Sequence, residues 1–303
     1  MRLNKGFFLI TIIAAISVLI LVPAIFFSLA SESLPSIGKF GIFSFLFSIT
    51  WDPVKEIFGA AASLYGTLVT TGIALAIAVP FSLGIAIFVT EVCPRPLRGI
   101  LGGSIELLAA IPSIIYGMWG LFTLAPIMAD HVEPFLQGTL GKLPIIGFLF
   151  RGTPMGIDIL TASIVLSIMI TPFISSIARD TFSLTPQILK ESAYGVGATK
   201  WEVIKNVIFP YSRLGVYGGI VIALGRALGE TMAVAFVLGN RHEIATSFFH
   251  ASATITVTLA NEFTEADSDL YLSSLFHLAL ILFVSSFIIL AISKYMVHRM
   301  ERP

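Results

Sequence analysis

Hydrophobic residues gather in six long runs along the chain, and segments richer in polar, Gly and Pro residues separate them. The runs lie near residues 7–30, 63–90, 100–129, 158–178, 213–239 and 270–293. A helix needs roughly 20 apolar residues to cross a hydrocarbon core about 30 Å thick. The pattern therefore predicts an all-α, polytopic membrane protein with six transmembrane helices, organised as one transmembrane domain over residues 1–303.

Composition agrees with this prediction. Hydrophobic residues make up 56% of the 303 residues and charged residues only 12%, and the mean hydropathy is +0.94. A typical soluble domain carries about twice that share of charged residues. Because the formal net charge is zero, nothing indicates a basic surface for nucleic acid.

The first run has features of a cleaved signal peptide. Arg2 and Lys5 precede it, and "SLA" at 28–30 imitates a cleavage site. Its apolar part is longer than the 7–15 residues of a signal peptide's hydrophobic region, which favours a retained first helix.

The distribution of lysine and arginine predicts the orientation, because short cytoplasmic loops accumulate these residues. If the N-terminus is cytoplasmic, twelve of them fall in cytoplasmic segments, five in the opposite segments, and Arg226 inside a span. The twelve are Arg2, Lys5, Arg95, Arg98, Arg179, Lys190, Lys200, Lys205, Arg213, Lys294, Arg299 and Arg302. The five are Lys39, Lys55, Lys142, Arg151 and Arg241. We therefore expect both termini in the cytoplasm.

The connections differ between the two sides. On the outer side, 31–62 and 130–157 are long and rich in Phe, Gly and Pro, which favours an interfacial position, with a docking surface as the alternative. On the inner side, 179–212 has helical spacing on both sides of Gly195 and Gly197. Thr185 before Pro186 is typical of a helix N-cap. This connection is expected to form two short helices that make a cytoplasmic knob.

The sequence contains no metal or nucleotide signature. Cys93 is the only cysteine, so a disulfide or a thiol metal site is excluded, and no cofactor is expected. A phosphate-binding loop, a zinc-protease motif and a nucleophile elbow are all missing. Energy for uphill transport would have to come from a partner or from an ion gradient.

The segment "ESAYGVGATKWEVIKNVIFP" at 191–210 resembles the EAA loop of binding-protein-dependent ABC importer permeases. Glu191, Ala193, Gly197 and Pro210 match the positions of that motif, while Ser192, Val207 and Phe209 depart mildly from it. The resemblance implies a type I ABC importer permease fold, in which this loop is the coupling helix that seats in a cytoplasmic ATPase.

Further segments narrow the resemblance. "FLFSITWDP" at 45–53, "ELLAAIPSIIYGMWGLFTLAP" at 106–126 and "GRALGETMAV" at 225–234 are similar to the PstC-type permease subunits of phosphate importers. The resemblance covers nearly the whole chain. It implies a second, PstA-type permease, two copies of a PstB-type ATPase, a periplasmic phosphate-binding protein, and a place in the bacterial inner membrane.

Arg226 and Glu230 are charged residues inside the fifth run. Arg226 follows Arg213 by thirteen residues, or about 20 Å of helix, which indicates a position near the middle of the bilayer. A four-residue spacing stacks both side chains on one helical face, which continues with Gly215, Gly219 and Ala223. Small residues on such a face allow close helix packing.

Two interpretations of the pair stay open. It forms an intrahelical ion pair that only steadies packing, or it lines the substrate pathway. In the second case the forked donors of Arg226 suit an oxyanion. Glu230 would accept a hydrogen bond from the protonated oxygen of hydrogen phosphate and repel fully deprotonated anions such as sulfate.

Three other residues within the predicted spans have simple structural interpretations. Glu106 is expected to reach the inner interface, His277 to pack between helices, and Pro112 to mark a kink. The leading hypothesis is thus a phosphate importer permease without enzymatic activity of its own. The alternatives are a proton-coupled secondary anion transporter, in which Glu230 carries the proton, and an ABC permease for sulfate or molybdate.

Overall fold

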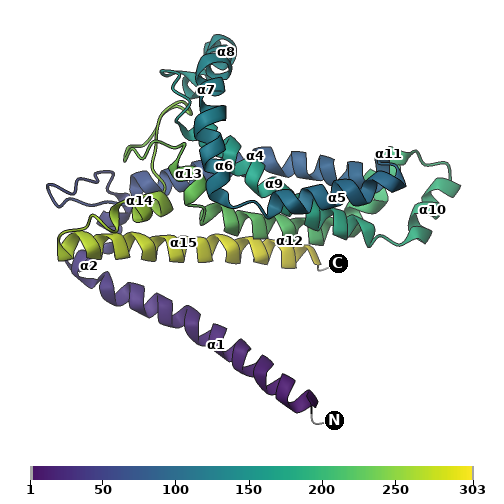
Figure 1. Cartoon of the computed structure of the whole chain (residues 1–303), viewed down its shortest axis with the longest axis horizontal. Coiled ribbons are helices and arrows are strands. Elements are labelled where there is room, and N and C mark those ends of the chain that lie inside the picture. The colour runs from purple at the N-terminus through teal and green to yellow at the C-terminus, as the bar shows by residue number, and fades with distance from the viewer. Residues whose placement is uncertain (1–2, 302–303) are drawn as a thin grey trace.

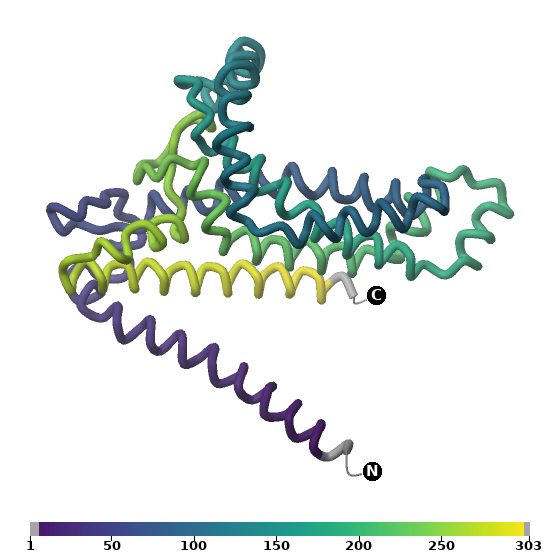
Figure 2. The backbone as a smooth tube through the Cα atoms, viewed as in Figure 1, coloured from purple at the N-terminus to yellow at the C-terminus, as the bar shows by residue number. Residues whose placement is uncertain are grey.

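The computed structural model describes residues 3–301 and the side chains from Gly6 to Arg299. Five helices lie side by side in a bundle (Figures 1 and 2). They are α4 (Ala61–Ile87), α5 (Arg95–Ala109), α9 (Ile159–Ser183), α12 (Phe209–Leu228) and α15 (Asp269–Glu301). Helix α9 is the central one, because it packs against α4, α5 and α12 and most of it is buried.

Shorter elements connect these helices. Over residues 3–301 no β-strand occurs, and six helical segments are long and apolar enough to span a membrane, as the sequence predicted. The remaining α-helices of the outer connections are α2 (Leu34–Phe40), α3 (Ile42–Phe47) and α14 (Ile255–Glu262). Helical turns of π type lie at Phe88–Val92, Gly120–Leu124, Met128–Val132 and Ile204–Ile208, and 3₁₀ turns at Leu140–Lys142 and Gly147–Phe150.

Helix α1 (Leu3–Glu32) diverges from the bundle (Figure 1). Its apolar window contains no buried residue. It touches α15 at its outer end, where the Phe26 and Phe283 rings lie 6.0 Å apart and Ser273 Oγ donates to the Glu32 carbonyl over 2.8 Å. The first run is therefore one long helix, held to the rest of the chain at one end.

The third run is not the single span predicted at 100–129. Helix α5 ends at Ala109, and α6 (Ser113–Trp119), α7 (Ala125–Ile127) and α8 (Glu133–Thr139) continue at a steep angle to it (Figure 1). Pro112 explains the break, because proline lacks an amide hydrogen and disfavours a helical conformation in the residue before it. The expected kink is a complete change of direction.

The fifth run also differs from the span predicted at 213–239. Helix α12 ends at Leu228. The next residue is Gly229, which has little preference for a helix, and α13 (Met232–Ala235) is a separate turn. At its N-terminal end the span is longer than expected. Helix α11 (Lys200–Val203) runs through a π turn directly into α12, so the apolar segment covers Lys200–Leu228.

The inner connection contains one short independent helix, α10 (Gln187–Gly195), followed by a turn at Gly197 with φ of 88°. The expected second short helix is instead the start of the fifth span. Thr185 is not the N-cap of α10, because Pro186 holds that position and the buried Thr185 hydroxyl lies 3.3 Å from Ser212 Oγ.

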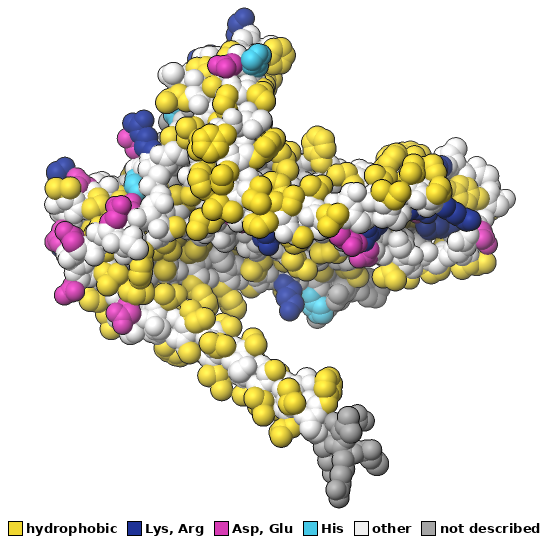
Figure 3. All heavy atoms as spheres, in the orientation of Figure 1, with side chains coloured by type: hydrophobic (Ala, Val, Ile, Leu, Met, Phe, Trp, Pro, Cys, Tyr) yellow, Lys and Arg dark blue, Asp and Glu magenta, His cyan; other side chains and the backbone are white. Residues whose placement is uncertain are grey.

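The N-terminal end of α1 and the C-terminal end of α15 point toward the end of the bundle where α10 and α11 lie (Figures 1 and 2). Hydrophobic side chains cover the flanks, whereas charged side chains gather at the two ends (Figure 3). This surface fits a bilayer. Cys93 is buried at the α4–α5 connection, with Sγ 3.5 Å from the Pro94 carbonyl. Of the charges used to predict orientation, Arg2, Arg302 and the Lys5 side chain lie outside the described residues.

Candidate functional site: a helix break beside Arg226

Arg226 lies in the last turn of α12, where the partial negative charge of the helix C-terminus favours a cation. Its guanidinium carbon is 4.3 Å from the centre of the Phe173 ring on α9. The side chain is exposed in the isolated chain, and none of the hydrogen bonds or ion pairs among residues 3–301 involves it. A guanidinium placed over an aromatic ring can still offer its N–H groups to an anion.

Glu230 does not share a helical face with Arg226. Because α12 ends at Leu228, Glu230 belongs to the break between α12 and α13. Its side chain is 9% exposed, and Oε1 accepts a hydrogen bond of 3.2 Å from the Ala233 amide in α13. Thr256 Oγ1 donates to the Glu230 carbonyl over 2.7 Å. Glu230 therefore supports the break, and no ion pair joins it to Arg226 in the described chain.

The small residues of α12 pack as predicted up to the break. Ala223 is fully buried, and a Cβ added at Gly219 would lie 3.0 Å from Ile177 of α9. These close contacts set α12 directly against α9. Phe173 and Arg226 thereby face each other across one helix interface. The sequence did not indicate Phe173, because an aromatic residue in an apolar span gives no signal of its own.

The EAA-like residues lie at the inner end of the bundle. Glu191 is exposed on α10 and accepts a hydrogen bond of 3.0 Å from Gln187 Nε2. The Ala193 carbonyl accepts from the Ala198 amide, which closes the turn around Gly197. Pro210 is the second residue of α12 and directly follows the π turn at Ile204–Ile208. The motif thus links α10 to the helix that carries Arg226.

A cross-link that the sequence did not reveal joins α10 to the second span. Lys190 Nζ lies 2.7 Å from Glu91 Oε1, and the two side chains are 20% and 12% exposed. These residues are 99 positions apart, so their spacing gave no hint of the contact. The ion pair therefore connects α10 to the π turn that follows α4.

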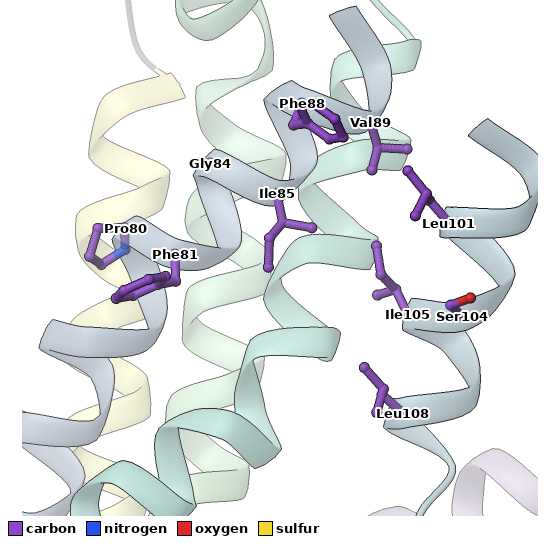
Figure 4. Close-up of a pocket in the computed structure, with 10 residues that line it drawn as sticks. All are labelled: Pro80, Phe81, Gly84, Ile85, Phe88, Val89, Leu101, Ser104, Ile105 and Leu108. Carbon is purple, nitrogen blue, oxygen red and sulfur yellow. The ribbon is translucent and has the colours of Figure 1, made fainter. Parts of the chain in front are cut away.

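Glu106 lies toward the end of the bundle that carries α10, and it has a partner there. Its Oε1 lies 2.8 Å from Arg179 Nη2, and Arg179 also pairs with Asp180 at 3.0 Å. Arg179 crosses α5 at Gly102, where no side chain blocks it. This ion pair holds α5 against α9. An apolar groove lies beside it between α4 and α5, lined by Phe81, Ile85, Phe88, Leu101, Ile105 and Leu108 among others (Figure 4).

At the outer end, four separate segments meet around Glu262. Its Oε2 accepts hydrogen bonds from Trp51 Nε1 at 2.6 Å and Tyr271 Oη at 2.7 Å, and its Oε1 lies 2.9 Å from His242 Nε2. Burial by itself raises the pKa of Glu262, but the hydrogen bonds from His242, Tyr271 and Trp51 together hold the pKa below its usual range. The carboxylate fastens the outer loops to α15.

His277 packs between helices, as expected. It is 1% exposed, stacks on Phe45 with ring centres 4.0 Å apart, and its Nδ1 lies 3.2 Å from Ser36 Oγ. Across the part of the chain that the structure describes, no group of three or more His, Cys, Asp or Glu side chains could hold a metal ion.

Comparisons with known proteins agree with this architecture. The chain is 55% identical to the phosphate transport system permease protein PstC of Mesorhizobium japonicum over 95% of this chain and 88% of that protein. It is 51% identical to the PstC protein of Pasteurella multocida, over 95% and 89%.

Solved structures show the same fold at low identity. A permease from a bacterial ABC transporter that imports alginate matches with a TM-score of 0.63 and 17% identity, over all of both chains. A permease of the MetNI methionine transporter in an inward-facing conformation matches with a TM-score of 0.59 and 15% identity, over 84% of this chain and all of that one. Residues 78–302 match the binding-protein-dependent transport system inner membrane component family, and this match, with the close relatives, shows that the chain belongs to that family.

Proposed function

We propose that the chain is the permease subunit of an ATP-driven phosphate importer, forms half of its translocation pathway and acts as a single transmembrane domain over residues 1–303. The observation that supports phosphate most directly is the similarity to PstC proteins over almost the whole chain. The exposed guanidinium of Arg226 fits that substrate, because its planar fork binds a tetrahedral oxyanion through two parallel hydrogen bonds.

The pathway would run along the exposed side of Arg226. The face that α9 and α12 present there is open in the single chain, and a second, PstA-type permease would close it. Irregular backbone at membrane depth is tolerated where it is buried in protein or lines an aqueous cavity. On the buried side of the break at Gly229, the Glu230 carboxylate accepts from the Ala233 amide and the Glu230 carbonyl accepts from Thr256. On its other side the break would border the path of the anion.

Energy would enter through α10. A pair of PstB-type ATPases would hold the segment 187–210, whose Ile188, Val196 and Trp201 are exposed. Movement of α10 would pass to α4 through Glu91 and to α12 through the π turn at Ile204–Ile208. A periplasmic phosphate-binding protein would deliver substrate on the opposite side, and both termini of the chain would be cytoplasmic.

Reconstitution tests this proposal. The chain, expressed with its candidate permease, ATPase and binding-protein partners in proteoliposomes, should take up labelled phosphate only when ATP is enclosed with the ATPase. Arg226→Gln should abolish uptake while assembly continues, as judged by co-purification. Uptake by the lone chain with a proton gradient and no ATP would contradict the proposal. Uptake of sulfate or molybdate in preference to phosphate would contradict the substrate.

A further inference from the structure

Two carboxyl groups meet in the interior at the outer end of the bundle, away from Arg226. Glu133 begins α8, and Asp158 is the N-cap of α9. Both residues are 0% exposed, and the Glu133 carboxylate reaches the segment just before Asp158, where it accepts a hydrogen bond from the Met155 amide. This contact joins the α6–α8 arm to the start of the central helix.

One oxygen of each carboxyl group has a conventional partner. Glu133 Oε2 accepts a hydrogen bond of 3.0 Å from the Met155 amide, and Asp158 Oδ1 accepts one of 2.8 Å from the Thr161 amide. The second oxygens, Glu133 Oε1 and Asp158 Oδ2, are buried without any partner. A buried acceptor without a donor is unfavourable, and two such oxygens on adjacent anions repel each other as well.

Among the described residues, no cation pairs with these carboxyl groups. The charged and titratable side chains on the packed segments are Asp130, His131, Lys142, Arg151, Arg241, His242, Glu243 and His250. No hydrogen bond or ion pair among residues 3–301 joins any of them to Glu133 or Asp158, and Arg151 Nε donates to the Gly141 carbonyl instead. Burial, and next the neighbouring Glu133, raise the pKa of Asp158, which lies just outside the span beginning at Ile159, to about 8.

We propose that Glu133 and Asp158 bind one proton between them, and that this shared proton fastens the outer arm to the N-terminus of α9. A proton on either group turns one of the unpartnered oxygens into a donor and leaves the other as its acceptor. The single O–H···O hydrogen bond then satisfies both oxygens and removes the repulsion. The site thus carries one negative charge rather than two.

The pH dependence follows from linkage. In the unfolded chain Asp158 would lose its proton near its ordinary pKa of 3.8, whereas burial and the neighbouring Glu133 raise that pKa to about 8 in the folded chain. Between these values the folded state binds more protons than the unfolded state, so stability falls as pH rises through this window. Above about pH 8 the contact between α8 and α9 becomes a repulsion between two carboxylates.

Amide variants test the proposal. Asp158→Asn keeps the N-cap acceptor and supplies a permanent N–H donor toward Glu133, so it mimics the protonated state. The matched control is Asp130→Asn, which removes an exposed carboxyl group from the same arm. Thermal unfolding of the full chain in its purified complex would be followed from about pH 5 to 9, together with the infrared C=O stretch of a protonated carboxylic acid.

We expect the wild-type complex to lose melting temperature with rising pH and to show the protonated-acid band at neutral pH. Asp158→Asn should lose that band. Its unfolding free energy should depend less on pH, by a slope equivalent to about one proton, and it should melt at a higher temperature than wild type above about pH 8. Asp130→Asn should change neither property. An unchanged band and slope in Asp158→Asn would overturn the proposal. So would a wild-type melting temperature that falls on chelation of divalent cations, since a metal ion would then occupy the site. If Asp158→Asn does not assemble, Glu133→Gln provides the same comparison.

Discussion

The Arg226 guanidinium lies over the ring of Phe173, and no carboxylate of the described residues pairs with it. We expect Arg226→Lys to reduce phosphate uptake about tenfold or more, because the ammonium keeps the charge but loses one of two charge-assisted hydrogen bonds, each contributing about 1.5–3 kcal/mol. Phe173→Leu should weaken uptake less and Phe173→Tyr should preserve it, since tyrosine retains the aromatic face. Uptake kinetics in vesicles would measure all three. Normal uptake by Arg226→Lys would show that the planar fork is not used.

Glu230 accepts a hydrogen bond from the Ala233 amide at the helix break, in addition to its proposed role as a filter against sulfate. Glu230→Gln keeps an oxygen acceptor for the Ala233 amide but loses the charge. We expect this variant to assemble, to transport phosphate more slowly, and to discriminate less against sulfate. Glu230→Ala removes the acceptor and should also reduce assembly. Paired phosphate and sulfate uptake in a binding-protein-independent background is the measurement, and an unchanged ratio in Glu230→Gln would leave Glu230 with only the structural role at the break.

At the scale of elements, the ion pair between Lys190 and Glu91 makes α10 a connected part of the bundle. Breaking a buried ion pair costs about 3–5 kcal/mol, and this pair is mostly enclosed. Lys190→Glu should therefore lower ATP-dependent uptake severely while ATP hydrolysis continues. The double variant Glu91→Lys with Lys190→Glu should recover part of the uptake. Equal losses in the single and double variants would exclude the pair as the route of coupling.

The sequence predicted the number of spans and the position of most of them, because apolar length is a strong local signal. It did not predict where helices stop inside an apolar run. The break after Leu228 depends on Thr256, which lies 26 residues from the Glu230 carbonyl that it contacts. Glu133, Asp158 and Phe173 were missed for the same reason, since their significance arises only from contacts between distant segments.

For the whole molecule, orientation remains a prediction, and Cys93 is a poor reporter of it. This thiol is 2% exposed, so a failure to react would follow from burial alone. In a Cys93→Ser background, Val196→Cys on the turn after α10 and Val54→Cys on the outer loop offer sites 87% and 95% exposed in the wild-type structure. A membrane-impermeant thiol reagent should label Val54→Cys in intact cells and Val196→Cys only after permeabilisation. The reverse pattern would invert the topology.

The short length of α5 has a consequence for the surrounding lipid. Helix α5 has 15 residues and is therefore about 22 Å long, whereas a hydrocarbon core is about 30 Å thick. Beside the apolar groove between α4 and α5, the bilayer therefore meets a helix shorter than its hydrocarbon core. A bilayer thins to match such a helix at a cost of a fraction of a kcal/mol per ångström. A conformational change that tilts α5 would alter this mismatch. The thickness of the bilayer would then influence the relative free energies of the conformations. Transport should then vary with acyl-chain length in reconstituted bilayers of otherwise identical composition.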